Sequence, residues 1–285
     1  MKKILVLGAT GTVGIPLVAD LVARGESVKA ASRGARAFEG AEAVRFDYTD
    51  PSTFAPAFEG VNRIYMLMPS DSLEVEACLL PVIAFAAARG VKVVMQSVMG
   101  VADDEHNPYR KVERALEASG TPWVILGPNW FSDNFHVLWG PAVAHGELAL
   151  PAGEGASSFI DARDIAASAA AALTTERFDG QAFTLTGPQA LGYREAAAVL
   201  SHAAGRPIRY TPISDDAFVA MLQGVGLPEV YGRMLAGLFS AVREGATASV
   251  SDGVEVLTGR PPRSLERYAS DHASAFAAPA GRAAH

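Results

Sequence analysis

The chain has 285 residues, of which 49% are hydrophobic and 19% charged, and its formal net charge is −7. This composition is typical of a globular protein with a substantial core, and the negative charge argues against a nucleic-acid-binding surface. No apolar run approaches the roughly 18 residues that a membrane span needs. A single cysteine, Cys78, excludes an intramolecular disulfide, so we expect a cytoplasmic protein.

Short apolar runs alternate with helical patterns through the first half of the chain. Strands are predicted at residues 3–8, 27–32, 42–46, 63–68, 91–97 and 122–127, and helices at 13–25, 72–90 and 108–120. Strands that are apolar throughout and alternate with helices predict a parallel sheet covered on both faces. The expected fold class is therefore α/β, a Rossmann doubly wound parallel sheet whose ligand binds beyond the carboxyl ends of the strands.

After about residue 129 the pattern becomes aromatic and then mainly helical. Helices are predicted at 159–175, 192–205, 214–226 and 228–245, with short strands near 181–186 and 207–211. We interpret residues 1–150 as a dinucleotide-binding Rossmann domain and residues 151–285 as a smaller, mostly helical C-terminal substrate-binding lobe, interleaved with the first and with an approximate boundary. The apolar helix at 228–243 is compatible with packing on this lobe and with a homodimer.

A glycine-rich turn follows the first predicted strand and opens the first predicted helix. In this context the glycines allow a tight turn, a close approach of the backbone to a pyrophosphate and close packing of the helix, whose free amides face the anion. The two threonines in the turn add hydroxyls that cap the helix or contact phosphate. The predicted dinucleotide site comprises Gly8, Thr10, Gly11, Thr12, Val13 and Gly14. The alternative is a structural turn in a protein that binds nothing.

The end of the second predicted strand indicates which dinucleotide is bound. An acidic residue there would bind the ribose 2′-hydroxyl of NAD(H) and repel a 2′-phosphate, but this chain carries Ser32 and Arg33. The planar guanidinium of Arg33 suits a phosphate, so NADPH is predicted, a solvated surface arginine being the alternative. Asp47, after the third strand, is predicted to accept from the adenine amino group. It is equally well placed for a turn or a helix cap, and Asp50 competes for the cap role.

Tyr109, at the start of the helix predicted at 108–120, raises the question of catalysis. It invites comparison with Tyr-x-x-x-Lys, the proton-relay pair of short-chain dehydrogenases, yet Glu113 stands four residues on. Lys111 points about 200° round the helix, away from the tyrosine face. A carboxylate at position 113 would raise the phenol pKa. The usual pair is therefore absent, and Lys111 is interpreted as a solvated lysine.

Four segments carry a family resemblance: TGTVG at 10–14, VERALEASGTPWVILGPNWFSDNF at 112–135, FIDARDIA at 159–166 and YREAAAVLSHAAGRPIRY at 193–210. They resemble the NmrA-like branch of atypical short-chain dehydrogenases, and the likeness runs over about residues 3–265. That branch includes quinone and triphenylmethane-dye reductases, phenylcoumaran-type ether reductases and festuclavine dehydrogenases. It takes its name from a regulator that binds the dinucleotide to control a partner protein.

The resemblance implies further site residues at strand ends on the ligand side of the sheet. Those implied for the cofactor are Leu67, Met68, Pro69, Ser97, Tyr109, Pro128 and Asn129; those implied for the substrate are Met99, Trp130, Phe131 and Asn134. Tyr109 falls where ether-reductase relatives carry a lysine and quinone-reductase relatives a histidine, and Gly127 replaces the usual arginine. For Ser97 the alternative is a hydroxyl that satisfies backbone groups; for the aromatic residues it is ordinary core packing.

These features predict an NADPH-dependent reductase that transfers hydride to an apolar aromatic or conjugated acceptor: an imine or iminium, a quinone, an enone or a cationic dye. Tyr109, with Ser97 or a water, is the expected source of the proton or of charge stabilisation. The absence of a strong acid–base pair favours acceptors that need no proton, with quinones next. No metal is expected. The alternative from another class is a non-catalytic NADP(H)-binding redox sensor, and fold alone does not decide between them.

Overall fold

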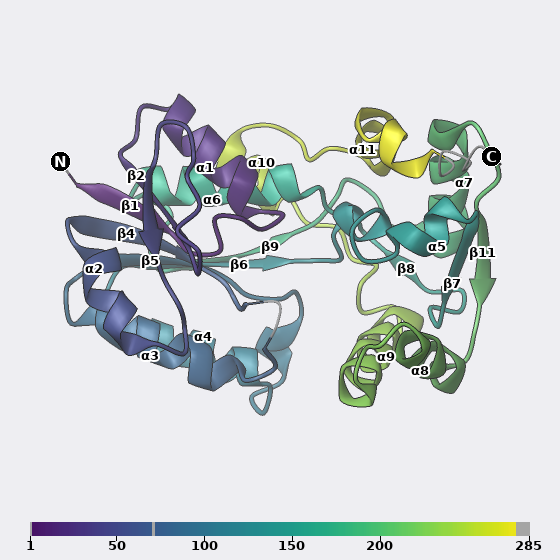
Figure 1. Cartoon of the computed structure of the whole chain (residues 1–285), viewed down its shortest axis with the longest axis horizontal. Helices are drawn as coiled ribbons and strands as arrows, with labels where there is room; N and C mark the ends of the chain where they lie inside the picture. The colour runs from purple at the N-terminus through teal and green to yellow at the C-terminus, as the bar shows by residue number, and fades with distance from the viewer. Residues whose placement is uncertain (1, 70–71, 278–285) are drawn as a thin grey trace, which may run out of the picture. The chain divides into compact units, whose positions relative to one another are not determined.

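The computed structural model describes residues 2–69 and 72–277, which form two compact units (Figure 1). The first unit comprises Met1–Pro128, Ala162–Leu185 and Asp252–Pro261. The second comprises Asn129–Asp161, Thr186–Ser251 and Pro262–His285. The chain therefore enters and leaves each unit more than once.

A seven-stranded sheet forms the centre of the first unit, and every neighbouring pair of its strands is parallel. In spatial order the strands are β3 (Glu42–Arg45), β2 (Val28–Ser32), β1 (Lys3–Val6), β4 (Val61–Met66), β5 (Lys92–Gln96), β6 (Trp123–Pro128) and β9 (Gln181–Leu185). The order reverses between β1 and β4, which is the switch point at which doubly wound folds bind ligands. The predicted Rossmann fold is confirmed, and each of the six strands expected in the first half is present.

Helices cover both faces of this sheet (Figure 1). One face carries α1 (Gly14–Ala23), α6 (Ala162–Thr174) and α10 (Gly253–Thr258), and the other carries α2 (Phe54–Phe58), α3 (Val75–Ala87) and α4 (Pro108–Glu117). Two short 3-10 helices, η1 (Pro51–Thr53) and η2 (Val101–Asp103), lie in the connections. Because both faces are covered, the central strands are buried along nearly their whole length, as their continuous apolar sequences require.

The segment from α6 to β9 belongs to the first unit, although its residues were expected in the C-terminal lobe. β9 extends the sheet by pairing with β6, and the Gly180 amide donates to the Trp123 carbonyl at 2.8 Å where the pair begins. Helix α6 begins directly after Asp161, as expected, and packs against α1. The division near residue 150 into a cofactor-binding domain and a substrate-binding lobe stays a prediction about function.

The second unit is mainly helical and has its own aromatic core. Its helices are α5 (Gly140–Ala144), α7 (Tyr193–Ala204), α8 (Asp215–Gly224), α9 (Glu229–Arg243) and α11 (Leu265–Asp271), with 3-10 helices η3 (Ser132–Phe135) and η4 (Ala273–Phe276). Two small sheets pair β7 (Glu147–Leu150) with β11 (Arg209–Pro212), and β8 (Ala156–Ser157) with β10 (Leu191–Gly192). Buried Phe135, Trp139, Tyr193 and Phe239 are central to the core. The apolar face of α9 thus packs within this unit, and a homodimer stays a prediction.

None of the helices within residues 2–69 and 72–277 is both long and apolar enough to cross a membrane. The location in the cytoplasm stays a prediction from the sequence.

Candidate cofactor and substrate site

The glycine turn lies between β1 and α1, at the carboxyl edge of the sheet. Gly8 has φ +64°, which an L side chain rarely adopts, so the turn off β1 requires glycine. The Gly11 amide donates to the Gly8 carbonyl at 2.9 Å and closes the turn. A Cβ atom on Gly14 would lie 2.1 Å from the Gly8 oxygen and 2.7 Å from the Ala9 Cα, so the start of α1 is pressed against the turn. The residues thus form a backbone cradle that fits a pyrophosphate.

The start of α1 leaves the amides of Val13 and Gly14 for a ligand, because the Ile15 amide donates to the Gly11 carbonyl at 3.0 Å and Pro16 has no amide hydrogen. The N-cap residue of α1 is Val13, whose side chain makes no capping hydrogen bond. The exposed threonines Thr10 and Thr12 cap nothing within the described part of the chain, although a capping role was one of the two roles expected for them. Their hydroxyls and the free amides of the helix start therefore remain for an anion.

Ser32 ends β2 beside the glycine turn and organises the loop that follows it. Its Oγ accepts from the Arg36 amide at 3.1 Å, and its carbonyl accepts from the Ala35 amide at 3.2 Å. The side chain of Arg33 is exposed in this loop. Ser32 and Arg33 thus lie at the polar edge beyond β2, and their binding of a 2′-phosphate stays a prediction.

Asp47 follows β3 and forms a tight polar turn. Its Oδ1 accepts from the Thr49 amide at 2.9 Å and from the Thr49 hydroxyl at 2.7 Å. These bonds hold the pKa of Asp47 below its usual value, with a smaller contribution from the charges of Arg45 and Arg33. Asp50 caps η1 by accepting from the Ser52 amide. The turn role weighed for Asp47 is therefore present, and its contact with adenine stays a prediction.

Leu67, Met68 and Pro69 follow β4 and are half-buried at the carboxyl edge. A Cβ atom on Gly8 would come within 2.9 Å of the Leu67 side chain, so this segment lies against the glycine turn. The Tyr48 hydroxyl donates to the Leu67 carbonyl at 2.6 Å and so holds the segment Leu67–Pro69 in place. Burial raises the pKa of Tyr48 far above its usual value, so the hydroxyl remains a donor. Sequence reasoning missed Tyr48, which no motif distinguishes from an ordinary core tyrosine.

Ser97 follows β5 and is buried, with 2% of its surface exposed. Its hydroxyl donates to Glu113 Oε1 at 2.5 Å, and Glu113 Oε2 accepts from Arg110 at 2.9 Å. The Ser97 amide donates to the Leu126 carbonyl at 2.7 Å. This hydroxyl therefore satisfies a side-chain carboxylate, whereas the alternative weighed from the sequence was a backbone group. Sequence reasoning also missed the partnership with Glu113 and Arg110.

Tyr109 lies in the first turn of α4, where its amide donates to the Asn107 cap at 3.0 Å. Its ring is half-buried and packs against the core beneath α4. Burial raises the pKa of the phenol. The expectation that Glu113 would cause this rise is wrong, because that carboxylate is paired with Arg110. Lys111 lies on the exposed face and pairs with Glu76 at 3.0 Å, in keeping with a solvated lysine.

The end of β6 lies against the segment after Ser97. The Met99 amide donates to the Pro128 carbonyl at 3.1 Å, and a Cβ atom on Gly127 would lie 3.4 Å from the Val98 carbonyl oxygen. Met99 is half-buried and Pro128 is buried. The structure thus brings these two predicted residues together at the same edge of the sheet as Ser97.

The remaining predicted residues lie in the second unit. Asn129 is buried: its Nδ2 donates to the Ser158 hydroxyl at 2.7 Å and the Thr247 carbonyl at 2.8 Å, and its Oδ1 accepts from the Trp130 amide. The side chain of Asn129 therefore holds three segments of this unit together, and its contact with a cofactor stays a prediction. Trp130 stacks on Phe239 with ring centroids 4.9 Å apart. Phe131 and Asn134 are half-buried nearby.

The model of the NmrA-like family matches residues 1–270. The chain belongs to the NmrA-like family. It is 36% identical to an uncharacterized oxidoreductase, YesF, of Bacillus subtilis, covering 96% of each chain. It is also 36% identical to an NAD(P)H azoreductase of Xenophilus azovorans, over 96% of this chain and 99% of that one. The solved structure of the Escherichia coli quinone oxidoreductase QOR2 complexed with NADPH is 27% identical, with a TM-score of 0.81 and coverage of 95% and 99%.

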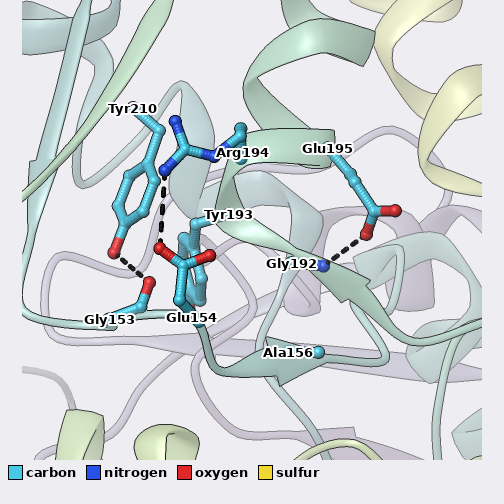
Figure 2. A pocket seen from close by; sticks show the side chains of 8 residues that line it. All are labelled: Gly153, Glu154, Ala156, Gly192, Tyr193, Arg194, Glu195 and Tyr210. Carbon is cyan, nitrogen blue, oxygen red and sulfur yellow. Dashed lines mark hydrogen bonds and ion pairs between the residues drawn. The ribbon is translucent and has the colours of Figure 1, made fainter.

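This NmrA-like chain also has a cavity of about 270 Å³ within its second unit (Figure 2). Figure 2 shows Arg194 directed at Glu154, the Tyr210 hydroxyl at the Gly153 carbonyl, and Glu195 at the Gly192 amide. None of the predicted site residues lines this cavity.

A larger cavity of about 440 Å³ opens at the amino ends of β4, β5 and β6. Arg63, Lys92 and Asp179 are among the residues that line it. Arg63 pairs with Glu26 at 2.9 Å, and Lys92 pairs with Asp179. In doubly wound folds ligands bind at the opposite, carboxyl ends of the strands, which is where the glycine turn, Ser32 and Ser97 lie.

Proposed function

We propose that this chain is an NADPH-dependent reductase that transfers hydride to an apolar aromatic or conjugated acceptor. The observation that carries the proposal is the glycine cradle at Gly8 and Gly14, with Ser32 and Arg33 beyond the adjacent strand. Its relatives support an oxidoreductase, since they include an NAD(P)H azoreductase and a quinone oxidoreductase solved with NADPH. Their substrates, azo compounds and quinones, are conjugated electron acceptors.

Two anionic groups of the dinucleotide define the binding site. The free amides of the α1 start, with the hydroxyls of Thr10 and Thr12, are proposed to bind the pyrophosphate. Ser32 and Arg33 are proposed to bind the 2′-phosphate of the adenosine ribose, because a guanidinium binds phosphate through paired donors. Asp47 is proposed to accept from the adenine amino group. The nicotinamide end is assigned to the segment Leu67–Pro69 with Ser97, Tyr109 and Pro128.

When bound, the reduced dinucleotide supplies a hydride to the acceptor. A quinone gains that hydride and one proton to become a hydroquinone, and we assign the proton to the Tyr109 hydroxyl. An iminium or a cationic dye is neutralised by the hydride alone, so it needs no proton. Because burial raises the pKa of Tyr109, its phenol is a weak acid that favours acceptors of the second kind.

The acceptor-binding residues that the resemblance implies stay predictions: Met99 in the first unit, and Trp130, Phe131 and Asn134 in the second. Trp130 and Phe131 offer aromatic faces, and flat conjugated molecules pack well against such faces. The side chain of Trp130 is held by its stacking on Phe239.

The test is the oxidation of NADPH by the purified protein against a panel of quinones, azo dyes, enones, cyclic imines and cationic dyes. NADPH and NADH binding is measured in the same samples. We expect turnover of at least one class and tighter binding of NADPH. Tight binding without any turnover would instead favour a redox sensor that uses the dinucleotide to control a partner. Tighter binding of NADH would contradict the role of Arg33.

For this panel Tyr109→Phe separates the acceptor classes. The variant is expected to lower kcat for quinones by roughly 10²- to 10⁴-fold, the usual contribution of a positioned acid, and to leave cationic dyes nearly unaffected. Tyr231→Phe, which removes a hydroxyl in the second unit, is the matched control. Equal losses for both acceptor classes would contradict a proton-donating role.

A further inference from the structure

Glu113 is a buried carboxylate at the point where α4 faces the carboxyl end of β5. Its side chain is 6% exposed, and both of its oxygens have partners: Ser97 Oγ at 2.5 Å on Oε1 and Arg110 Nη1 at 2.9 Å on Oε2. A buried charge is costly unless it is paired and hydrogen-bonded. Its presence beside the proposed nicotinamide end points to a role beyond packing, because an apolar side chain would fill the same space without burying a charge.

The charge of Glu113 is balanced by a network confined to α4 and the loop before it. Arg110 Nη1 also bonds to Glu117 at 2.9 Å, and Arg114 links Glu117 at 3.0 Å to Glu105 at 2.8 Å. Arg110 compensates the charge of Glu113, and none of these contacts ties Glu113 to the sheet. The bond that joins the helix to the end of β5 is the one between Glu113 and Ser97.

Tyr109 shares a helix face with Glu113. Residues four apart on a helix are neighbours, and Tyr109 lies one turn, about 6 Å, nearer the helix start. A helix that connects two parallel strands runs back from their carboxyl edge, so its start lies at that edge. Because Glu113 is fixed at Ser97, just after β5 ends, Tyr109 is held one turn further out, above the carboxyl edge. The hydrogen bond between Ser97 and Glu113, here called the clamp, thus fixes how far Tyr109 lies beyond the carboxyl edge of the sheet.

The clamp also fixes the direction of the Ser97 hydroxyl. Its hydrogen points at a carboxylate, which only accepts, so toward any other partner Ser97 offers lone pairs alone. Ser97 is then an acceptor for a donor on the cofactor, and it does not supply a proton to the substrate. This narrows the role of Ser97 predicted from the sequence, in which Tyr109, with Ser97 or a water, supplies the proton or stabilises the developing charge.

We propose that Glu113 is a positioning residue of the reductase: it fixes Ser97 as a hydrogen-bond acceptor and holds Tyr109 at the carboxyl edge of the sheet. The proposal rests on the proposed function for its effect on turnover, and on the Ser97–Glu113 bond for its effect on structure. In the position where the usual short-chain dehydrogenases place a lysine that acts on the tyrosine, this chain has a carboxylate that acts on the serine.

The experiment compares Glu113→Gln, Ser97→Ala and the double variant, each also combined with Tyr109→Phe. Glu113→Gln keeps the size of the side chain but places an amide nitrogen against a donor on Ser97 or on Arg110, so one of the two bonds is lost or reversed. Glu76→Gln is the matched control, because Glu76 also contacts α4 but from the exposed side, through Lys111. The readouts are kcat and KM with a quinone, and hydrogen–deuterium exchange over residues 107–113.

Glu113→Gln and Ser97→Ala are each expected to lower kcat by roughly 10- to 100-fold, the usual effect of a misplaced catalytic group. Ser97→Ala is also expected to raise KM for NADPH, because it removes a hydrogen-bond acceptor of the cofactor. The double variant is expected to lose no more than the worse single one, and Glu113→Gln to have little further effect when Tyr109 is Phe. Exchange at 107–113 rises in both single variants and not in Glu76→Gln.

Additive losses in kcat, or a kcat unchanged by Glu113→Gln, would overturn the proposal. If Glu113→Gln does not fold, the proposal is decided by Ser97→Ala, which removes a single oxygen atom, compared alone and in combination with Tyr109→Phe. If the wild-type protein reduces no acceptor, the proposed function fails. Hydrogen–deuterium exchange over residues 107–113 then still tests the clamp: unchanged exchange in Ser97→Ala refutes it. Faster exchange in Ser97→Ala shows that the clamp holds α4 in place but overturns its role in turnover.

Discussion

A Cβ atom on Gly14 would lie 2.1 Å from the carbonyl oxygen of Gly8, a separation that real Cβ atoms do not adopt. The first residue of α1 is therefore fixed against the turn by backbone alone. We expect Gly14→Ala to lower the free energy of unfolding by about 1–3 kcal/mol, because overpacking forces the backbone to shift. The same shift displaces the amides of the helix start, so NADPH binding should weaken as well, which calorimetry would measure.

Gly11→Ala is the matched contrast in the same turn. A Cβ atom there would be 3.3 Å from the Gly8 oxygen, and Gly11 is exposed, so the fold should tolerate it. NADPH binding should still weaken by about tenfold or more, 1.4 kcal/mol per tenfold, since the methyl group occupies the path of the pyrophosphate. Gly237→Ala, with open space around its Cβ, should change neither property adversely. Unaltered NADPH affinity in Gly11→Ala would argue against this loop as the phosphate site.

The preference for NADPH over NADH is expected to depend on Arg33. A charge-assisted hydrogen bond contributes about 1.5–3 kcal/mol, so Arg33→Ala should reduce the ratio of the two affinities by roughly 10- to 100-fold. Binding of NADH should be almost unchanged, because it lacks the 2′-phosphate. Arg24→Ala removes another exposed guanidinium of this unit, paired with Asp20 at 2.8 Å, and should leave the ratio as it is. A ratio unchanged in Arg33→Ala would assign the 2′-phosphate to other groups.

Asn129→Ala tests whether the hydrogen bonds of the Asn129 side chain stabilise the second unit. Its loss leaves the Thr247 carbonyl and the Trp130 amide without their partners, so the free energy of unfolding should fall by about 1–3 kcal/mol. Chemical denaturation would measure this change, while the affinity for NADPH should stay within about twofold. Asn134→Ala, a few residues further on, should cost little. A large loss of NADPH affinity with normal stability would indicate a direct contact between the Asn129 amide and the cofactor.

The stability of the second unit is expected to fall as the solution is acidified through the range of histidine. The Tyr268 hydroxyl lies 2.5 Å from His136 Nδ1, and the His272 ring stacks at 5.2 Å. Burial, with the charge of His272, holds the pKa of His136 below its ordinary value of 6.5. Below that value the unfolded chain binds a proton that the folded chain does not, so stability is complete above about pH 6.5 and declines as the pH falls.

His136→Asn should therefore flatten the dependence of Tm on pH between about pH 7.5 and pH 5.5. His106→Asn, in an exposed loop of the first unit, serves as the control and should leave the slope unchanged. A slope that is the same in wild type and His136→Asn would assign the acid sensitivity to other groups.

Local pattern was sufficient to predict the elements of the sheet and its helices. β1 and β5 are mainly apolar, and helical patterns separate the strands, which admits few alternatives to a parallel sheet. The place of β9 could not be predicted in the same way. β9 is a short strand of five residues, Gln181–Leu185, most of which are not buried. Its pairing with β6 depends on how α6 crosses the sheet.

In the candidate site, too, features set by local sequence could be predicted, and those set by contacts between distant residues could not. The glycine turn and Ser32–Arg33 were predicted because their roles are set by backbone geometry and by charge within a few residues. The clamp of Ser97 by Glu113 was not, because it depends on the distance between residues 16 apart that two different elements bring together. The structural bonds of Asn129 were not predicted for the same reason, since its partners at 158 and 247 are distant in the chain; its predicted contact with a cofactor stays a prediction.

The chain passes between its two compact units five times, after Pro128, Asp161, Leu185, Ser251 and Pro261. Neither unit is thus a continuous gene segment, and no single cut yields either one whole. Exchange of either unit for another would therefore need several cuts at once. Substitutions within a segment such as 129–161, whose two ends are both attached to the first unit, leave this connectivity intact.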